Sequence, residues 1–210
     1  MGRFLAAFLV SAALVACQNE THAVFSPAPR PTPHTASTAA VLQSSDVPAG
    51  LRACPGSGPI DVYIAVMQST EGNVGGRATE AWLQLVRDGA VSGAISLFVA
   101  NQSACKAELG ASAGVKAMTS FVAQFVDENA ADRAWHDGVF GFVPPPPGAL
   151  TPGVAVGSST GLGVSSFTYE RPSVRLACWR HGVFVALVVV SSFDLNTFKA
   201  TTAAVDPRLN

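Results

Sequence analysis

Three apolar segments near the C-terminus place the strongest constraint on the fold. They are Phe167–Glu170, Val174–Arg180 and Val183–Ser191. Their length and their content of β-branched and aromatic residues predict three successive strands. Arg171-Pro172-Ser173 and His181-Gly182 separate them and are typical of turns, so the strands form an antiparallel meander. The last strand is apolar on both alternating faces, and we expect it in the middle of a sheet.

Three other segments have the apolar spacing of amphipathic helices. They cover residues 77–88, 127–136 and 194–205. In the first, apolar residues recur at i, i+3, i+4 and i+7, and Gly89 follows as a stop signal. Asp127 and Asp194 are good N-cap residues for the other two. The glycine-rich run Gly72–Gly76 is expected to be an irregular segment that interrupts the secondary structure before the first helix.

Two earlier segments are predicted to be strands. Ile60–Gln68 is apolar on both alternating faces, as in a buried strand, and Val115–Val126 alternates as a strand does. Between them, Ser92–Asn101 is either a helix or a strand. Pro144–Pro147 cannot join a central strand and is predicted to form a stiff polyproline II excursion.

The order of these elements predicts an α+β fold. Strands and helices do not alternate regularly, and the last strands form a meander, so we expect a mainly antiparallel, or mixed, sheet with helices packed on one face. The C-terminal stretch contains Cys178, a tight turn, an apolar strand and an Ala-rich helix. It resembles extracellular sensor domains of bacterial receptor kinases, but it carries no specific motif from which a functional residue is transferred.

The N-terminus carries a targeting signal. A basic start precedes a charge-free apolar run from Phe4 to Ala16, and small residues lead into Cys17. The run is shorter than the roughly 20 apolar residues of a membrane-spanning helix. Leu14-Val15-Ala16-Cys17 resembles the lipobox of bacterial lipoproteins. The resemblance implies that residues 1–16 are removed as a signal peptide; the alternative is an ordinary signal peptide cut elsewhere.

By the same resemblance, diacylglycerol and a further acyl chain such as palmitate are attached to Cys17. The protein would then be held at the cell membrane or outer membrane, facing the periplasm or the exterior. Residues 17–50 are rich in Pro, Ala, Ser and Thr and are predicted to form a disordered tether. Residues 51–210 have the length of a single α+β domain.

The cysteines suggest one disulfide. An extracytoplasmic compartment permits such bonds, and the three cysteines other than Cys17 allow at most one pair and one thiol. Cys54 precedes Pro55-Gly56 and Cys105 lies in a polar stretch, so these two are the preferred pair. Cys178 lies within a predicted strand and is expected to be a small buried hydrophobe.

One sequence match suggests hydrolysis. Gly157-Ser158-Ser159-Thr160-Gly161 satisfies G-x-S-x-G, and Glu170 and His181 follow in the order serine, acid, histidine. A nucleophile elbow needs a strand before the serine and a helix after it, whereas this loop leads into a strand. Ser159 and His181 are therefore weak catalytic candidates.

Other candidate chemistry is weaker still. Glu128, Asp132 and His136 lie along one helix face, but a zinc site needs ligands that converge, so a solvated face is expected. Of the three tryptophans, Trp82 and Trp135 lie on core-facing helix stripes, so packing is favoured over a ligand cleft. Walker A, dinucleotide-binding, C-x-x-C and H-E-x-x-H motifs do not occur.

The charge pattern argues against one class of binding partner. The formal net charge is -1 and Lys and Arg are scattered singly, so nucleic acid is not expected as a partner. No cofactor or metal is expected either. The leading hypothesis is a lipid-anchored, non-enzymatic domain of the bacterial cell envelope that binds a partner protein or a small ligand. The alternatives are an extracytoplasmic serine hydrolase and a structural lipoprotein that spaces envelope layers.

Overall fold

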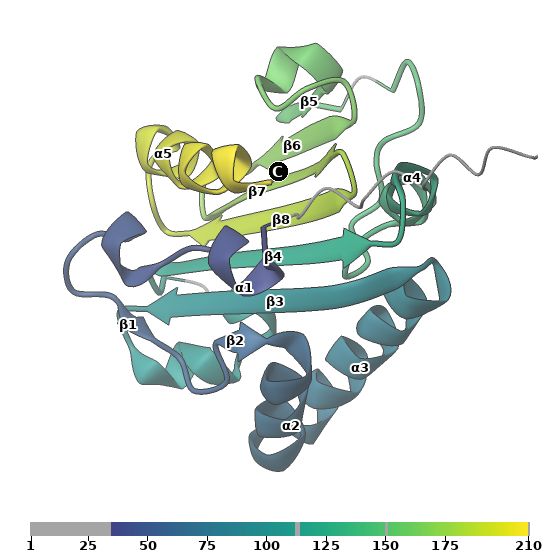
Figure 1. The fold of residues 1–210 in the computed structure, drawn as a ribbon. Coiled ribbons are helices and arrows are strands. Elements are labelled where there is room, and N and C mark those ends of the chain that lie inside the picture. Colours follow the sequence, from purple (N-terminus) through teal and green to yellow (C-terminus); the bar gives the residue numbers. More distant parts are fainter. Residues whose placement is uncertain (1–34, 112–113, 150, 210) are drawn as a thin grey trace, which may run out of the picture. The chain divides into compact units, whose positions relative to one another are not determined.

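An antiparallel sheet forms the centre of the computed structural model, which describes residues 35–111, 114–149 and 151–209 (Figure 1). The strands are β1 (Arg52–Ala53), β2 (Gly58–Pro59), β3 (Ala90–Val99), β4 (Ala117–Phe125), β5 (Val154–Val156), β6 (Ser166–Glu170), β7 (Val174–His181) and β8 (Phe184–Ser191). Their order is β1-β3-β4-β8-β7-β6-β5, and β2 also pairs with β3. Every pairing among the described strands is antiparallel, so the predicted α+β class with an antiparallel sheet is confirmed.

Helices pack on both faces of the sheet, rather than on one face as the sequence predicted. They are α1 (Ser37–Ala40), α2 (Ile60–Thr70), α3 (Gly72–Arg87), α4 (Glu128–Asp137) and α5 (Leu195–Val205). Short 3-10 turns are η1 (Ser44–Asp46), η2 (Gln102–Lys106), η3 (Glu108–Gly110), η4 (Gly157–Thr160) and η5 (Asp206–Arg208). Buried residues of α2, α3 and α4 share one cluster, and those of α1 and α5 share another across the sheet. None of the described helices is long and apolar enough to cross a bilayer.

The central strand β8 explains why both faces need a cover. It lies between β4 and β7, as its two-sided apolar sequence predicts. Val185, Leu187 and Val189 belong to the cluster under α2, α3 and α4. The residues between them, such as Val188, belong to the cluster under α1 and α5. A strand that is apolar on both sides keeps water off only if each side is packed.

Two local predictions in the first half of the domain are wrong. Ile60–Gln68 forms most of helix α2 rather than a strand, because Ile60, Tyr63 and Met67 bury a single helical face. The run Gly72–Gly76 is not an irregular segment but forms the first turn of helix α3. At Gly75 a side-chain Cβ would come within 2.5 Å of the Gln68 backbone, so the missing side chain lets α2 and α3 pack closely. The segment Ser92–Asn101, left open between helix and strand, lies mostly in β3.

The remaining elements follow the predicted pattern closely. Asp127 caps α4 by accepting a hydrogen bond from the Ala130 backbone at 2.7 Å. Asp194 caps α5 in the same way, accepting from the Thr197 backbone at 2.7 Å. The C-terminal meander consists of β6, β7 and β8 with their expected antiparallel register. These segments carry both the right apolar spacing and an explicit start or turn signal.

Residues 35–50 belong to the folded domain, although the sequence predicted them to be part of the tether. Ala40, Val41 and Leu42 are buried against the sheet. The Leu42 backbone donates a hydrogen bond to Ser120 Oγ on β4 at 2.8 Å. The domain boundary therefore lies before residue 51. Residues 1–34, which include the predicted signal peptide, Cys17 and the first part of the predicted tether, lie outside the described residues.

A bidentate ion pair fastens this N-terminal segment to the other end of the chain. Arg208 donates to both carboxylate oxygens of Asp46 at 2.8 Å and to the Val41 carbonyl at 3.1 Å. The Asp46 side chain is only 11% exposed. The hydrogen bonds from Arg208 hold the pKa of Asp46 below its ordinary value, although burial opposes them. The ion pair thus joins η1 to η5 and closes the packing of α1 over the sheet.

We predict that Asp46→Asn lowers the free energy of unfolding by about 2 kcal/mol at pH 7, the size expected for a hydrogen-bonded charged group. The pKa of Asp46 is lowered in the folded state, so its stabilisation is present above the ordinary aspartate pKa of about 3.9 and is lost as pH falls through the lowered value. Urea titrations from pH 7 down to pH 2 measure this, and the difference between variant and wild type should vanish at the acid end.

Asp61→Asn is the matched control, since Asp61 is exposed and forms no ion pair among the described residues. It should change stability by less than about 1 kcal/mol, as expected for a single exposed carboxylate in the first turn of a helix. Equal, pH-independent losses in the two variants would show that the Asp46–Arg208 pair does not hold the segment.

Candidate functional site

A long loop between α4 and β5 borders an apolar hollow on the sheet. The chain leaves α4 at Gly138, whose φ of 101° and close approach to the Val143 side chain exclude a larger residue. Val139 and Phe142 then exchange two backbone hydrogen bonds at 3.0 and 2.9 Å. Phe140 packs edge-on against Phe121 of β4, with ring centroids 4.9 Å apart. The beginning of the loop is therefore pinned to the core.

After Phe140, the loop and the sheet form the two walls of an open groove of about 540 Å³. Its lining residues are Gly141, Phe142, Val143, Pro145, Thr151, Val154, Phe167, Tyr169 and Leu176. Phe167 and Tyr169 alternate along β6 and so project from the same face of the sheet, beside Leu176 of β7. We call this hollow the groove. Its volume falls within the roughly 300–1,000 Å³ of small-molecule sites.

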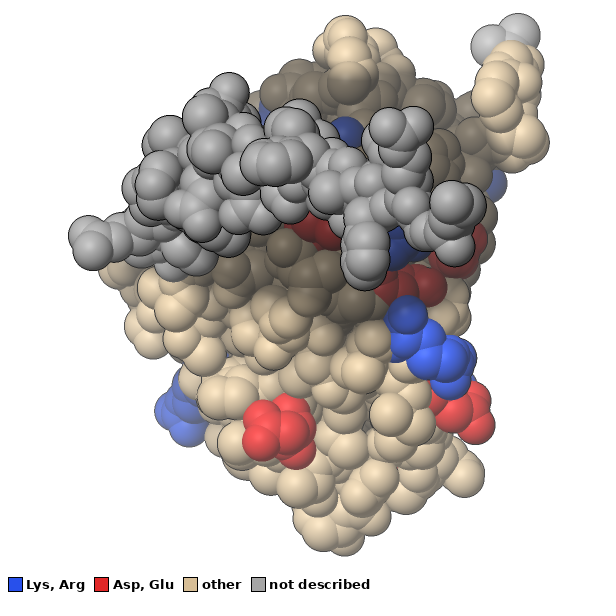
Figure 2. Space-filling model, turned by 45° about the vertical axis from the view of Figure 1, so that its right-hand side comes forward, with Lys and Arg blue, Asp and Glu red and all other residues tan. Residues whose placement is uncertain are grey.

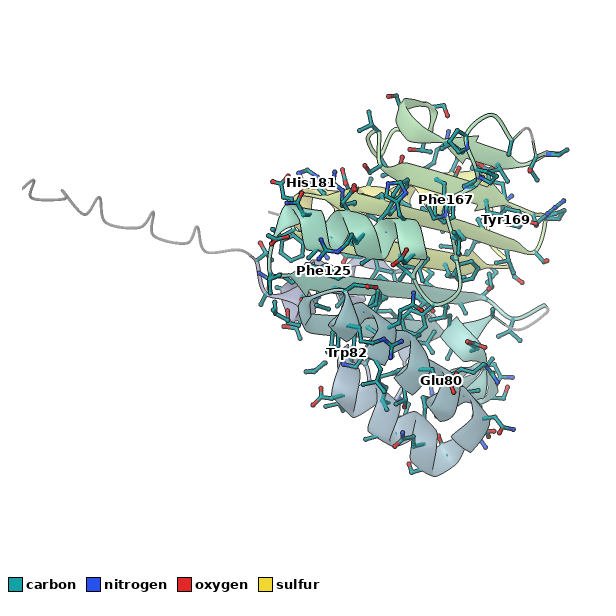
Figure 3. All side chains as sticks on the ribbon, turned by 90° about the vertical axis from the view of Figure 1, so that its right-hand side faces the viewer. Glu80, Trp82, Phe125, Phe167, Tyr169 and His181 are labelled. Atoms are coloured by element: carbon teal, nitrogen blue, oxygen red, sulfur yellow. A yellow bond between two sulfur atoms is a disulfide. The ribbon has the colours of Figure 1, made fainter. Side chains whose placement is uncertain are left out.

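The groove continues toward α3 through two neighbouring hollows. The first, of about 380 Å³, is lined by Glu108, Leu109, Ala111, Phe140, Phe142, Val174 and Val189. The second, of about 490 Å³, is lined by Arg77, Glu80, Ala81, Gln84, Arg87, Glu108, Phe140 and Gly141. Each pair of hollows shares a lining residue, Phe140, Gly141 or Phe142, so the three lie next to one another, and we call them together the depression. Figure 3 shows its two ends, with Phe167 and Tyr169 on β6 and Glu80 on α3.

Charged groups lie at the two ends of this depression. At the α3 end, Arg77 Nε lies 2.8 Å from Glu108 Oε2, with Glu80 and Arg87 nearby. At the β6 end, Arg171 Nε donates to the Tyr169 hydroxyl at 2.8 Å, and its guanidinium lies 4.9 Å from the Tyr169 ring centroid. Figure 2 shows a face of the molecule with few, scattered charges. No charged side chain lines the groove, whereas Glu108 lines both of the other hollows.

The structure does not assemble the catalytic group suggested by G-x-S-x-G. Ser159 lies in η4, where its hydroxyl donates to the Val156 carbonyl at 2.8 Å, and no long helix follows it. Glu170 pairs with Arg175 at one end of β7, whereas His181 ends the same strand about 20 Å away at 3.3 Å per residue. Figure 3 shows His181 and Tyr169 at opposite ends of the strands. The side chain of His181 instead lies 4.0 Å from Asp206.

The acidic and histidine residues of α4 do not converge either. Asp132 lies 3.2 Å from Arg180 of β7 and 3.7 Å from His136. Glu128 is exposed. Among the described residues, no group of three His, Cys, Asp or Glu side chains is placed to hold a metal ion.

The cysteines and tryptophans are placed as their sequence contexts predict. Cys54 and Cys105, the preferred pair, form a disulfide with their Cα atoms 5.5 Å apart. Cys178 is free and fully buried, and this burial raises the pKa of its thiol. Trp135 is buried and the partly buried Trp82 packs edge-on against Phe121 in the same cluster. Trp179 is buried on the opposite face, where its Nε1 donates to Asp206 at 2.8 Å.

The groove residues were not singled out in the sequence analysis. The available signals were the run Pro144–Pro147, which prevents a strand there, and Phe142 and Val143 just before it. These signals predict a stiff loop but do not say which part of the sheet it faces. No family model, curated protein or solved structure matches the chain.

The disulfide supports the wall of the depression that carries Glu108 and Leu109. It ties the segment after β1 to η2, which directly precedes these two residues. Tyr63 of α2 is buried nearby, and its burial together with the charge of Glu108 raises its pKa to about 12. The tyrosine hydroxyl therefore stays protonated and neutral at physiological pH.

We predict that replacing both Cys54 and Cys105 by Ser lowers the free energy of unfolding by about 4 kcal/mol, the loop-closure entropy of a bond spanning 51 residues. Denaturant unfolding of the oxidised wild type and the double variant measures this loss. Wild type treated with a reductant should lose the same amount, while the double variant should not respond to reductant. A double variant as stable as the oxidised wild type would contradict the prediction.

Proposed function

We propose that this protein is a lipid-anchored domain of the bacterial cell envelope that binds a small apolar ligand in the groove. The observation that carries the proposal is the groove itself, with a volume of about 540 Å³. Small-molecule sites are concave and mostly apolar, with a few polar groups that orient the ligand. Among the residues that line the groove, Thr151 and Tyr169 carry hydroxyl groups that can orient a ligand, and most of the others are aromatic or aliphatic.

The exposure of the loop wall supports this use of the groove. Phe142 is 37% exposed and Val143 is 56% exposed. Large apolar side chains that share an exposed concave surface are unfavourable in water, and a bound ligand would cover them. A purely structural spacer would bind no ligand, so nothing would cover these apolar side chains.

The envelope location is supported by independent features of the chain. The segment ending at Cys17 resembles a lipoprotein lipobox. A disulfide such as Cys54–Cys105 persists in an oxidising compartment. The folded domain begins before residue 51, so the tether from Cys17 would consist of residues 18–34. The lipid on Cys17 would thus attach the domain to the membrane through this tether.

A bulky side chain placed in the groove should abolish ligand binding. We expect the neutral fluorescent dye Nile red to bind wild type, and Val154→Trp to raise its Kd about tenfold or more because the indole occupies the space beside Tyr169. Val164→Trp is the matched control, since Val164 is 78% exposed and does not line the groove. Fluorescence titration measures both.

Two results would overturn the proposed site. One is that wild type does not bind Nile red at all, and the other is that Val154→Trp binds it as tightly as wild type. Circular dichroism of each variant identifies a loss of binding that comes from unfolding.

The anchor is tested separately from the groove. When the full chain is expressed in a bacterium that processes lipoproteins, mass spectrometry of the membrane fraction should show a mature N-terminus at Cys17 carrying acyl chains. Cys17→Ser should remove the acyl chains and release the protein from the membrane. An unmodified N-terminus, or one at another residue, would contradict the lipoprotein assignment.

A further inference from the structure

We infer that the ligand of the groove is an anionic amphiphile, an apolar chain ending in a carboxylate that Arg171 binds. This inference rests on the proposed function, because it names the ligand class of the same groove. Arg171 follows β6 directly, and Tyr169, two residues earlier, lines the groove. The hydrogen bond from Arg171 Nε to the Tyr169 hydroxyl, at 2.8 Å, places the guanidinium next to a residue that lines the groove.

The Arg171 guanidinium is a positive charge with which no carboxylate in the described part of the chain pairs. It forms no ion pair with any residue in the described part of the chain, and only its Nε donates a hydrogen bond there. The neighbouring Glu170 alternates to the opposite face of β6, where it lines a separate hollow together with Lys199 of α5. The terminal nitrogens of Arg171 therefore remain available to a ligand.

Tyr169 gives this guanidinium a defined orientation. The ring lies 4.9 Å from the guanidinium carbon, a distance typical of cation–π contacts. The hydroxyl also accepts the Nε hydrogen. A guanidinium held in this way presents its two terminal nitrogens as a fork that matches the two oxygens of a carboxylate.

The opposite end of the depression lacks a comparable charge. Arg77 is already paired with Glu108 at 2.8 Å. Arg87 and Glu80 line the same hollow and carry opposite charges. With two cations and two anions, this end attracts neither sign strongly, so the anionic group belongs at Arg171.

The extent of the depression between its two ends fits an alkyl chain. The lining residues come from β5, β6, β7 and β8, which span about 14 Å at 4.8 Å per strand. The three hollows share Phe140, Gly141 and Phe142 as lining residues and so lie side by side. An extended alkyl chain that crosses these neighbouring hollows would cover more of their apolar lining than a ligand confined to one of them.

The test compares dodecanoate with 1-dodecanol, which have the same chain but differ in charge, by displacement of Nile red from the full-length protein. Wild type should bind dodecanoate about tenfold more tightly, as expected for one charge-assisted hydrogen-bonded pair. In Arg171→Gln the two affinities should become equal. Arg171→Lys should keep part of the preference, and Tyr169→Phe should weaken it by removing the acceptor of the Nε hydrogen bond.

Arg52→Gln is the matched control, because Arg52 is an exposed arginine on β1 at the opposite edge of the sheet. It should retain the wild-type preference for dodecanoate. Equal affinities in wild type, or a preference that survives in Arg171→Gln, would overturn the inference. If Nile red binds but neither compound displaces it, the inference also fails while the groove remains a ligand site. If Nile red itself does not bind, the proposed function fails together with the inference.

Discussion

The structure depends on one strand, β8, that is apolar on both sides. Its position between β4 and β7 places it where neither side reaches water. Each face of the sheet must therefore be packed, and different parts of the chain supply the two covers. The helices α2, α3 and α4 cover one face, and α5 with residues of the N-terminal segment covers the other. The burial of this strand links residues 35–50 and α5 to the rest of the domain.

The two covers differ in how they extend over the outer strands. On one face α4 packs against β4, β7 and β8. Over β6 the same face meets Phe142, Val143 and Pro145 of the loop that follows α4. A loop with consecutive prolines is stiff but cannot interdigitate with a sheet as a helix does. The space left between them is the groove, so the candidate site follows from a change of cover from helix to loop.

The helices and segments that cover the other face of the sheet include the residues nearest in sequence to the proposed lipid anchor. Residues 35–50, which follow the proposed tether in the sequence, pack on the sheet through Val41 and Leu42. The Asp46–Arg208 ion pair fastens them to the C-terminus. If Cys17 is held in a membrane, the segment that carries this attachment also completes the core. A shift of this segment would therefore change the packing on the face opposite the groove.

The sequence by itself determined the elements whose signals are local. The meander of β6 to β8 has apolar strands and explicit turns, and Asp127 and Asp194 begin their helices through hydrogen bonds within one turn. Only the tertiary structure decided that Ile60–Gln68 is helical, because a short segment with apolar residues on both alternating faces fits a buried strand or a helix equally well. It also decided which part of the sheet the proline loop covers and where Arg171 lies. Those facts depend on contacts between residues far apart in the chain, which apolar spacing and turn signals do not encode.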